Sequence, residues 1–222
     1  MTLIPATPLP DPTPFPRRTI DTSHMPVEAF GERSPVWWGN TLMLCIETST
    51  VAILVASYFY LRWNYQEWPP PKVDAFPPIR RPFPGLGFST VNVLLLMLSV
   101  PVMIWTHRAA LRMDKKRVLV GVATMFVASV AISALRAVEF RETRFWWNDN
   151  AYASIVWSIL GMHLLYSLSG ALEFLVMGLY VISHELDEAH ALDVTLAGIY
   201  WYWVAGTGAI IYAVVYWGAR LL

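Results

Sequence analysis

Cysteine and charge are both scarce in this sequence. Only one of the 222 residues is a cysteine, Cys45, so the chain can form no internal disulfide and no metal site made of thiolates. Charged residues make up 14% of the chain, and 16 Lys and Arg residues balance 16 Asp and Glu residues. Because a chain without net charge has no basic field to attract nucleic acid, we expect no nucleic-acid partner.

Motifs for catalysis are missing as well. The sequence contains neither the Gly-rich loop that cradles phosphates nor the nucleophile elbow of hydrolases. Of its five histidines only His163 lies deep in an apolar run, so no pair of haem ligands is visible. The histidines of the short acidic run from His184 to His190 are six residues apart, which fits no zinc motif and favours a solvated loop. We therefore predict no catalytic residue and no metal site in this chain.

Apolar residues, by contrast, are abundant. They make up 56% of the chain and its mean hydropathy is +0.45, more apolar surface than a soluble domain buries. Five runs approach or exceed the roughly 20 residues that cross a bilayer, at about residues 36–61, 88–106, 118–138, 151–182 and 195–217. They do not alternate as barrel strands do, so they predict helices. The expected fold is an all-α integral membrane protein, with a bundle of five transmembrane helices over residues 36–222.

The first 35 residues form a different kind of segment. Met1 to Pro16 contains six prolines and no apolar core of signal-peptide length, which predicts an extended, uncleaved Pro-rich tail. Basic residues divide equally between the two sides of the predicted bundle, but the loop from His107 to Arg117 concentrates five of them in eleven positions. Dense basic loops favour the cytoplasm, so we expect a multi-pass protein with a cytoplasmic N-terminus.

Polar side chains inside the apolar runs are the candidates for function, because a charge at the bilayer centre costs about 2.5 to 3.5 kcal/mol on insertion scales. Glu47 and Glu173 are the hardest to explain as packing. Arg136 and Glu139 are three residues apart and can pair on one helical face. Asn40, His107 and Glu139 lie near the ends of the runs, where a side chain can reach the interface. His163 is expected to be a hydrogen-bonded packing residue rather than a ligand, and Asn92 is a candidate for an interhelical bond.

Small residues within the runs predict places where helices approach closely. Among them are Gly121, Gly161, Gly206 and Gly208. We expect most of these to be ordinary packing positions.

Five groups of residues recur in the order and spacing of a known family. They are Gly39 to Tyr60 with Glu47 at its centre; Asn92 and Ser99 before Trp105 and His107; Glu139-Phe140; Tyr152 before Gly161-Met162-His163 and Gly170; and Tyr200-Trp201 before Tyr216-Trp217-Gly218. From Trp38 to Gly218 the chain thus resembles subunit III of the haem-copper oxidases, the cytochrome c and quinol oxidase family, in its short five-helix form. Tyr166, Tyr202 and Ala205 stand where the family has two histidines and an aspartate, which marks a divergent member.

This resemblance implies a non-catalytic supporting subunit of a terminal oxidase in aerobic respiration. Such a subunit packs on the catalytic subunit I, contacts other oxidase subunits, binds phospholipid, and supports proton uptake and the stability of the complex. Haem and copper are then expected in subunit I, and phospholipid is the only ligand expected of this chain. The expected location is the cell inner membrane, the bacterial plasma membrane.

The resemblance also suggests roles for the polar residues. Glu47 would be the buried carboxylate facing subunit I, with His163 as a polar packing partner, while Glu173 has no counterpart in the family pattern. These three are our candidates for contact with subunit I or for proton-related roles. The candidates for a polar network or lipid contact are Asn92, His107, Arg136, Glu139 and Tyr152.

Two other functions remain open. The chain could be an accessory subunit of a nitric-oxide reductase or a related complex, which the co-purifying catalytic subunit would reveal. It could also be a small proton-coupled transporter or channel that uses Glu47 and Glu173, in which case the purified chain would conduct in liposomes. The sequence shows neither broken helices nor repeated halves, which weighs against a transporter.

Overall fold

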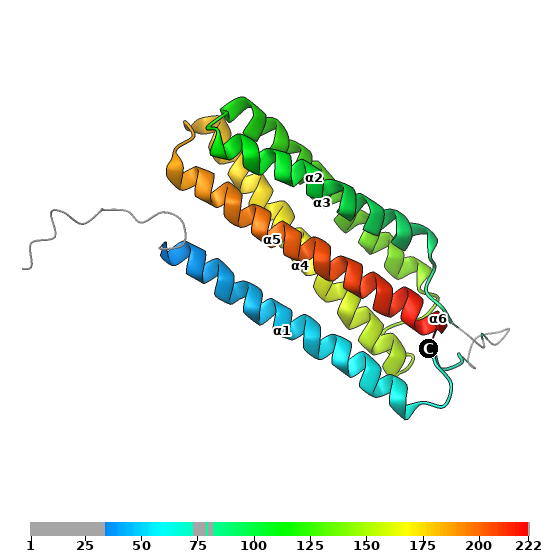
Figure 1. Ribbon diagram of the computed structural model, residues 1–222. Helices are drawn as coiled ribbons and strands as arrows, with labels where there is room; N and C mark the ends of the chain where they lie inside the picture. Colours follow the sequence, from blue (N-terminus) through cyan, green and yellow to red (C-terminus); the bar gives the residue numbers. More distant parts are fainter. Residues whose placement is uncertain (1–33, 73–78, 80–81, 222) are drawn as a thin grey trace, which may run out of the picture.

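The computed structural model describes residues 34–72, 79 and 82–221, and helices packed along a common axis make up most of them (Figure 1). Of the predicted Pro-rich tail, only Ser34 and Pro35 belong to the described residues. The rest of that prediction lies outside them.

Five helices in the described part of the chain are long and apolar enough to span a membrane. This confirms the predicted fold class, a multi-pass all-α bundle. In chain order the helices are α1 (Pro35–Asn64), α2 (Gly87–Leu111), α3 (Lys115–Glu142), α4 (Ala151–Ser183) and α5 (Glu188–Tyr212), and α5 continues into a π-helical turn, η2 (Ala213–Gly218), and a last turn, α6 (Ala219–Leu221).

Polar caps set where the helices begin, so several start outside the apolar runs seen in the sequence. The side chain of Asp114 accepts a hydrogen bond from Arg117 N (3.2 Å) at the start of α3, and Asn150 does the same for Ala153 N (2.9 Å) at α4. Asp187 caps α5 through His190 N at 2.9 Å. As a result α5 begins at Glu188, well before the apolar run at about residue 195.

The helices lie in a layered order. In Figure 1, α1 is on one side of α4 and α5, while α2 and α3 are on the other, and the start of α1 and the C-terminus lie at opposite ends of the bundle. An odd number of spans requires this separation of the ends. Within α1, only Val51 and Tyr58 are fully buried, and both lie in its second half.

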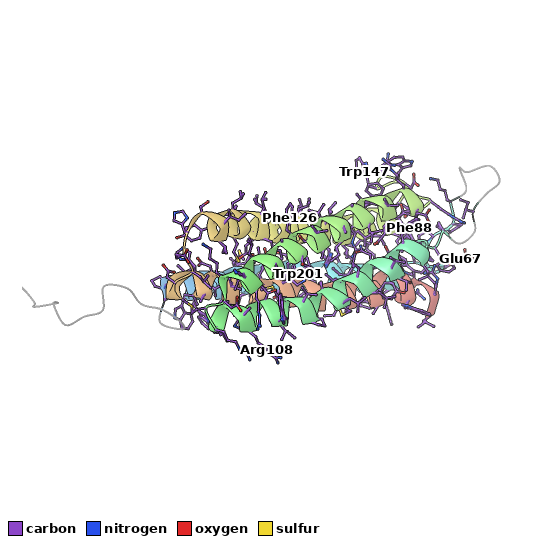
Figure 2. The ribbon with its side chains drawn as sticks, turned by 90° about the horizontal axis from the view of Figure 1, so that it is seen from above. Glu67, Phe88, Arg108, Phe126, Trp147 and Trp201 are labelled. Carbon is purple, nitrogen blue, oxygen red and sulfur yellow. The ribbon has the colours of Figure 1, made fainter. Side chains whose placement is uncertain are left out.

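An aromatic cluster fastens that second half of α1 to the start of α4. Trp68 Nε1 donates a hydrogen bond to Tyr58 Oη at 3.0 Å, and the ring of Trp68 meets that of Tyr152 edge-on with centroids 4.8 Å apart. Phe145 also packs against Tyr152, with ring centroids 5.3 Å apart. Figure 2 shows the neighbouring residues Glu67 and Trp147 at this same end of the bundle.

An ion pair joins two connecting segments at the same end. Lys72 Nζ lies 2.5 Å from Asp149 Oδ2, and Trp146 N also donates to this carboxylate. Desolvation alone would raise the pKa of Asp149, but the hydrogen bonds from Lys72 and Trp146 and the Lys72 charge outweigh it, and the pKa lies below its ordinary value. The pair is therefore present near neutral pH and is lost when Asp149 is protonated in acid.

Candidate functional site

A buried network of polar side chains lies between α2, α3, α4 and η2. At its centre is the carboxylate of Glu139, which is 3% exposed. Its Oε2 accepts hydrogen bonds from Arg136 Nη1 at 2.6 Å and from Tyr216 Oη at 2.5 Å. Its Oε1 accepts a third from Asn92 Nδ2 at 2.6 Å. One carboxylate therefore joins side chains from three elements.

Charge balance makes this burial tolerable. Arg136 and Glu139 are both almost fully buried, and they form an ion pair within one turn of α3. The pairing expected from their spacing is present. A buried ion is stable only when it is paired and its remaining polar atoms are satisfied, and here the carboxylate has three donors. Two atoms of the network, Arg136 Nε and Asn92 Oδ1, have no hydrogen-bond partner among the described residues.

Glu139 was expected near the membrane interface, but its side chain is buried inside the bundle. The apolar run ends at about residue 138, but α3 continues to Glu142. Glu139 is consequently inside the helix and covered by α2 and η2, where Asn92 and Tyr216 bond to it.

His163 extends the network into α4 and is completely buried. Its Nε2 lies 3.1 Å from the carbonyl oxygen of Val204, which can only accept, so we assign the ring proton to Nε2. Its Nδ1 then accepts from Arg136 Nη2 at 3.4 Å. Both ring nitrogens of His163 are engaged, and among the described residues no hydrogen bond joins it to Glu47. The imidazole acts as a hydrogen-bonded link between α3, α4 and α5.

Glu47 lies on the opposite side of α4 and α5, on α1. It is half-buried, and its Oε2 is shielded but accepts no hydrogen bond from the described residues. Electrostatically it acts on Tyr166 of α4 and Tyr200 of α5. Tyr200 Oη in turn donates to the carbonyl oxygen of Tyr166 at 3.2 Å. The carboxyl group of Glu47 therefore still needs a donor from beyond the described residues or a proton of its own.

Glu173 lies nearer the end of α4, on the wall of a cavity of about 760 Å³ between α1, α4 and α5. Asp193 of α5 lines the same cavity and acts electrostatically on Glu173. The cavity is otherwise mainly apolar.

Two further candidates lie apart from these groups. His107 is half-buried near the end of α2 and makes no hydrogen bond within the described part of the chain. Tyr152 is completely buried in the aromatic cluster, and its hydroxyl has no hydrogen-bond partner among the described residues. Tyr152 thus lies in the aromatic cluster and not beside the buried network around Glu139, and its predicted role in a polar network or at lipid stays a prediction.

Two residues escaped the sequence analysis. Tyr216 was seen only as part of a motif, although a tyrosine hydroxyl inside an apolar run needs a partner and so signals a buried acceptor. Asp193 precedes the apolar run that starts at about residue 195 and lies after the acidic run from His184 to His190, so it was not among the candidates. The sequence does contain a signal for its position: aspartate is a favoured N-cap residue, and a helix that starts after Asp187 includes Asp193.

The donor groups of the described residues do not gather into a metal centre. No three His, Cys, Asp or Glu side chains in this part of the chain could hold one ion. His190 Nδ1 bonds to the Asp187 carboxylate, and His184 stacks on Tyr180. The arrangement is suited to holding helices together. The carboxyl groups of Glu173 and Asp193 line one cavity, and Glu47 of α1 lies outside its lining.

Comparison with known proteins identifies the family. The model of a family described as cytochrome c oxidase subunit III matches residues 38–220. Proteins named cytochrome c oxidase subunit 3 are similar to the chain: that of Prototheca wickerhamii is 24% identical over 152 residues, 68% of this chain and 55% of the relative. The protein of Lycodon semicarinatus is 25% identical over 177 residues, 79% of this chain and 67% of the relative. That of Spodoptera frugiperda is 23% identical over 150 residues, 68% of this chain and 97% of the relative.

The chain spans about half the length of the first of these relatives. The family match, however, includes all five long helices, from the first turn of α1 to α6. On this evidence the chain belongs to the cytochrome c oxidase subunit III family.

Proposed function

We propose that this chain is the supporting subunit III of a haem-copper terminal oxidase and that it carries no catalytic centre itself. The observation that carries the proposal is the family match over residues 38–220. In such a complex, haem and copper reside in the catalytic subunit I, on which this chain packs.

The geometry of His163 supports a non-catalytic role. It is the histidine buried deepest in the bundle, and both of its ring nitrogens are used by Val204 and Arg136. A haem ligand needs a ring nitrogen free to bind iron. His163 therefore does not fit the role of a haem ligand, and the proposal assigns the chemistry of oxygen reduction to the partner.

The position of Glu47 on α1 supports α1 as the helix that lies nearest to subunit I. Large apolar side chains cover the outer face of α1, including Leu42, Ile46 and Ile53, each more than half exposed. The carboxyl group of Glu47 has an oxygen without a hydrogen bond in the described chain. A donor from a neighbouring subunit would complete it, as an intramembrane carboxyl group requires.

The finer aspects of this function follow from the same assignment. The chain binds phospholipid on its apolar faces, supports proton uptake by the catalytic subunit and prolongs the life of the complex during turnover. We place it in the bacterial inner membrane with the N-terminus in the cytoplasm. The basic loop between α2 and α3 is then also cytoplasmic, and Lys72 lies on the opposite side of the membrane.

Removal of the chain tests whether its role is supporting rather than catalytic. Membranes from cells with and without it are compared for haem absorbance and for oxygen consumption over many turnovers. We expect the haem signals of the oxidase and its initial activity to persist, while activity decays faster during turnover. Immediate loss of oxygen reduction with the haem spectrum and the level of subunit I intact would contradict the proposal, because this chain would then be needed for chemistry.

A further inference from the structure

The cavity beside Glu173 exists because the first half of α1 stands away from the bundle. Between Ser34 and Val51 no residue of α1 is fully buried, whereas Tyr58 near its other end has no exposed surface. Val36, Gly39 and Met43 of α1 form one wall, and Leu172 and Val176 of α4 form another. A volume of about 760 Å³ is within the range of small-molecule sites, roughly 300 to 1,000 Å³.

The charged groups of this cavity are mostly acidic. Glu173 and Asp193 both line it and repel each other electrostatically. His190 is the one side chain of the lining that can carry a positive charge, and its Nδ1 already bonds to Asp187. Glu173 makes no hydrogen bond within the described residues. The two carboxyl groups thus face an apolar space without a lysine or arginine among the residues that line it.

Apolar walls with two carboxyl groups determine which kind of ligand fits the cavity. A protonated amine supplies up to three hydrogen-bond donors and a positive charge. The charge would serve Glu173 above all, because its electrostatic partner is the like-charged Asp193, whereas Asp193 is already influenced by His190. A hydrocarbon chain attached to the amine would cover the apolar walls. A phosphate group would instead bring a third negative charge to a place without a basic side chain, which disfavours a phospholipid headgroup.

We propose that this cavity binds a hydrophobic amine without phosphate, with the ammonium group at Glu173 and Asp193 and the hydrocarbon chain between α1 and α4. Neither carboxyl group belongs to the buried network around Glu139. The inference goes beyond the proposed oxidase role and does not depend on it, because the site is formed by this chain alone.

Equilibrium dialysis of the full chain in phosphatidylcholine nanodiscs tests the proposal. Radiolabelled dodecylamine is the probe, 1-dodecanol is its uncharged match, and empty nanodiscs correct for partitioning into lipid. We expect saturable binding of dodecylamine at one site at neutral pH. Because each carboxylate can accept a charge-assisted hydrogen bond from the ammonium group, the double substitution Glu173→Gln with Asp193→Asn should weaken dodecylamine binding about tenfold or more. The binding of 1-dodecanol should not change.

Two further variants test separately whether binding depends on the charges inside the cavity and on its free space. Glu185→Gln removes an exposed carboxylate at the same end of the bundle but outside the cavity, and it should leave binding unchanged. Gly39→Leu should weaken binding of both probes, because Gly39 lines the cavity and a Cβ there meets no atom within 4 Å, so the added side chain can take up part of the space. Gel filtration and thermal unfolding establish that each variant is folded.

Several results would overturn the proposal. Equal binding of dodecylamine and 1-dodecanol, or no effect of the double substitution, would show that charge plays no part. Unchanged binding in the Gly39→Leu variant would place the probe elsewhere. If phosphatidylethanolamine in the nanodisc displaces dodecylamine, the occupant is a phospholipid and the proposal is wrong.

Discussion

At the scale of single residues, Glu139 has the greatest influence on how the helices meet. Its carboxylate receives hydrogen bonds from Asn92 of α2, Arg136 of α3 and Tyr216 of η2. These partners are 47, 3 and 77 residues away in the sequence. Because the Arg136 charge is buried beside it, removal of the carboxylate leaves an ion without a counterion.

The substitution Glu139→Gln should therefore destabilise the protein strongly. Breaking a buried ion pair by removing one partner costs about 3 to 5 kcal/mol, so we expect a clear fall in the midpoint of thermal unfolding in detergent. The double substitution Arg136→Met with Glu139→Leu removes both charges and should recover much of that loss. If the double variant is less stable than Glu139→Gln alone, the ion pair is not the source of the effect.

A second residue-scale prediction concerns the hydrogen bond between Trp68 and Tyr58. Tyr58→Phe leaves the buried indole N–H without an acceptor, which costs about 1 to 3 kcal/mol. We expect a lower unfolding midpoint and faster proteolysis of the segment that follows α1. Tyr60→Phe is the matched control, since Tyr60 is on the same helix but 70% exposed, and it should behave as the native protein. Equal behaviour of the two variants would refute the role of this bond.

At the scale of helices, close approach depends on a few glycines. A Cβ atom at Gly121 of α3 would lie 2.1 Å from Thr106 Oγ1 and 2.8 Å from Thr106 Cβ of α2, so rotation of the threonine side chain cannot relieve the clash. Gly208 similarly faces Leu96 and His163. Gly161 and Gly206, also expected to allow close approach, face open space. Residue type alone could not distinguish the two glycines at helix contacts from the two that face open space, because the sequence does not tell which side of a helix meets a neighbour.

The substitution Gly121→Ala should push α2 and α3 apart. Overpacking of this kind costs about 1 to 3 kcal/mol, which should lower the unfolding midpoint. Gly161→Ala adds the same methyl group to the middle of α4 without a contact, and its higher helix propensity should leave the midpoint equal or higher. A similar loss in both variants would mean that the contact at Thr106 does not limit the approach of the helices.

At the scale of the whole molecule, the apolar runs were enough to predict five spanning helices, since the length of a run is a local property. The pairing of Arg136 with Glu139 was also predictable, because both lie on one helical turn. The partners of that pair were not, since Asn92 and Tyr216 arrive from other helices. The meeting of Glu173 with Asp193 likewise requires α5 to begin at Glu188, and the cap at Asp187 rather than hydropathy decides that start.

The central claim is that this chain is bound to the catalytic subunit of a terminal oxidase. Gentle purification of the tagged chain from its native membrane, followed by a reduced-minus-oxidised haem spectrum and identification of the co-eluting proteins, tests it most directly. We predict that a haem-bearing catalytic subunit of a terminal oxidase elutes with the chain in fixed proportion. Elution of the folded chain alone, without haem, or with the catalytic subunit of a nitric-oxide reductase, would contradict the account.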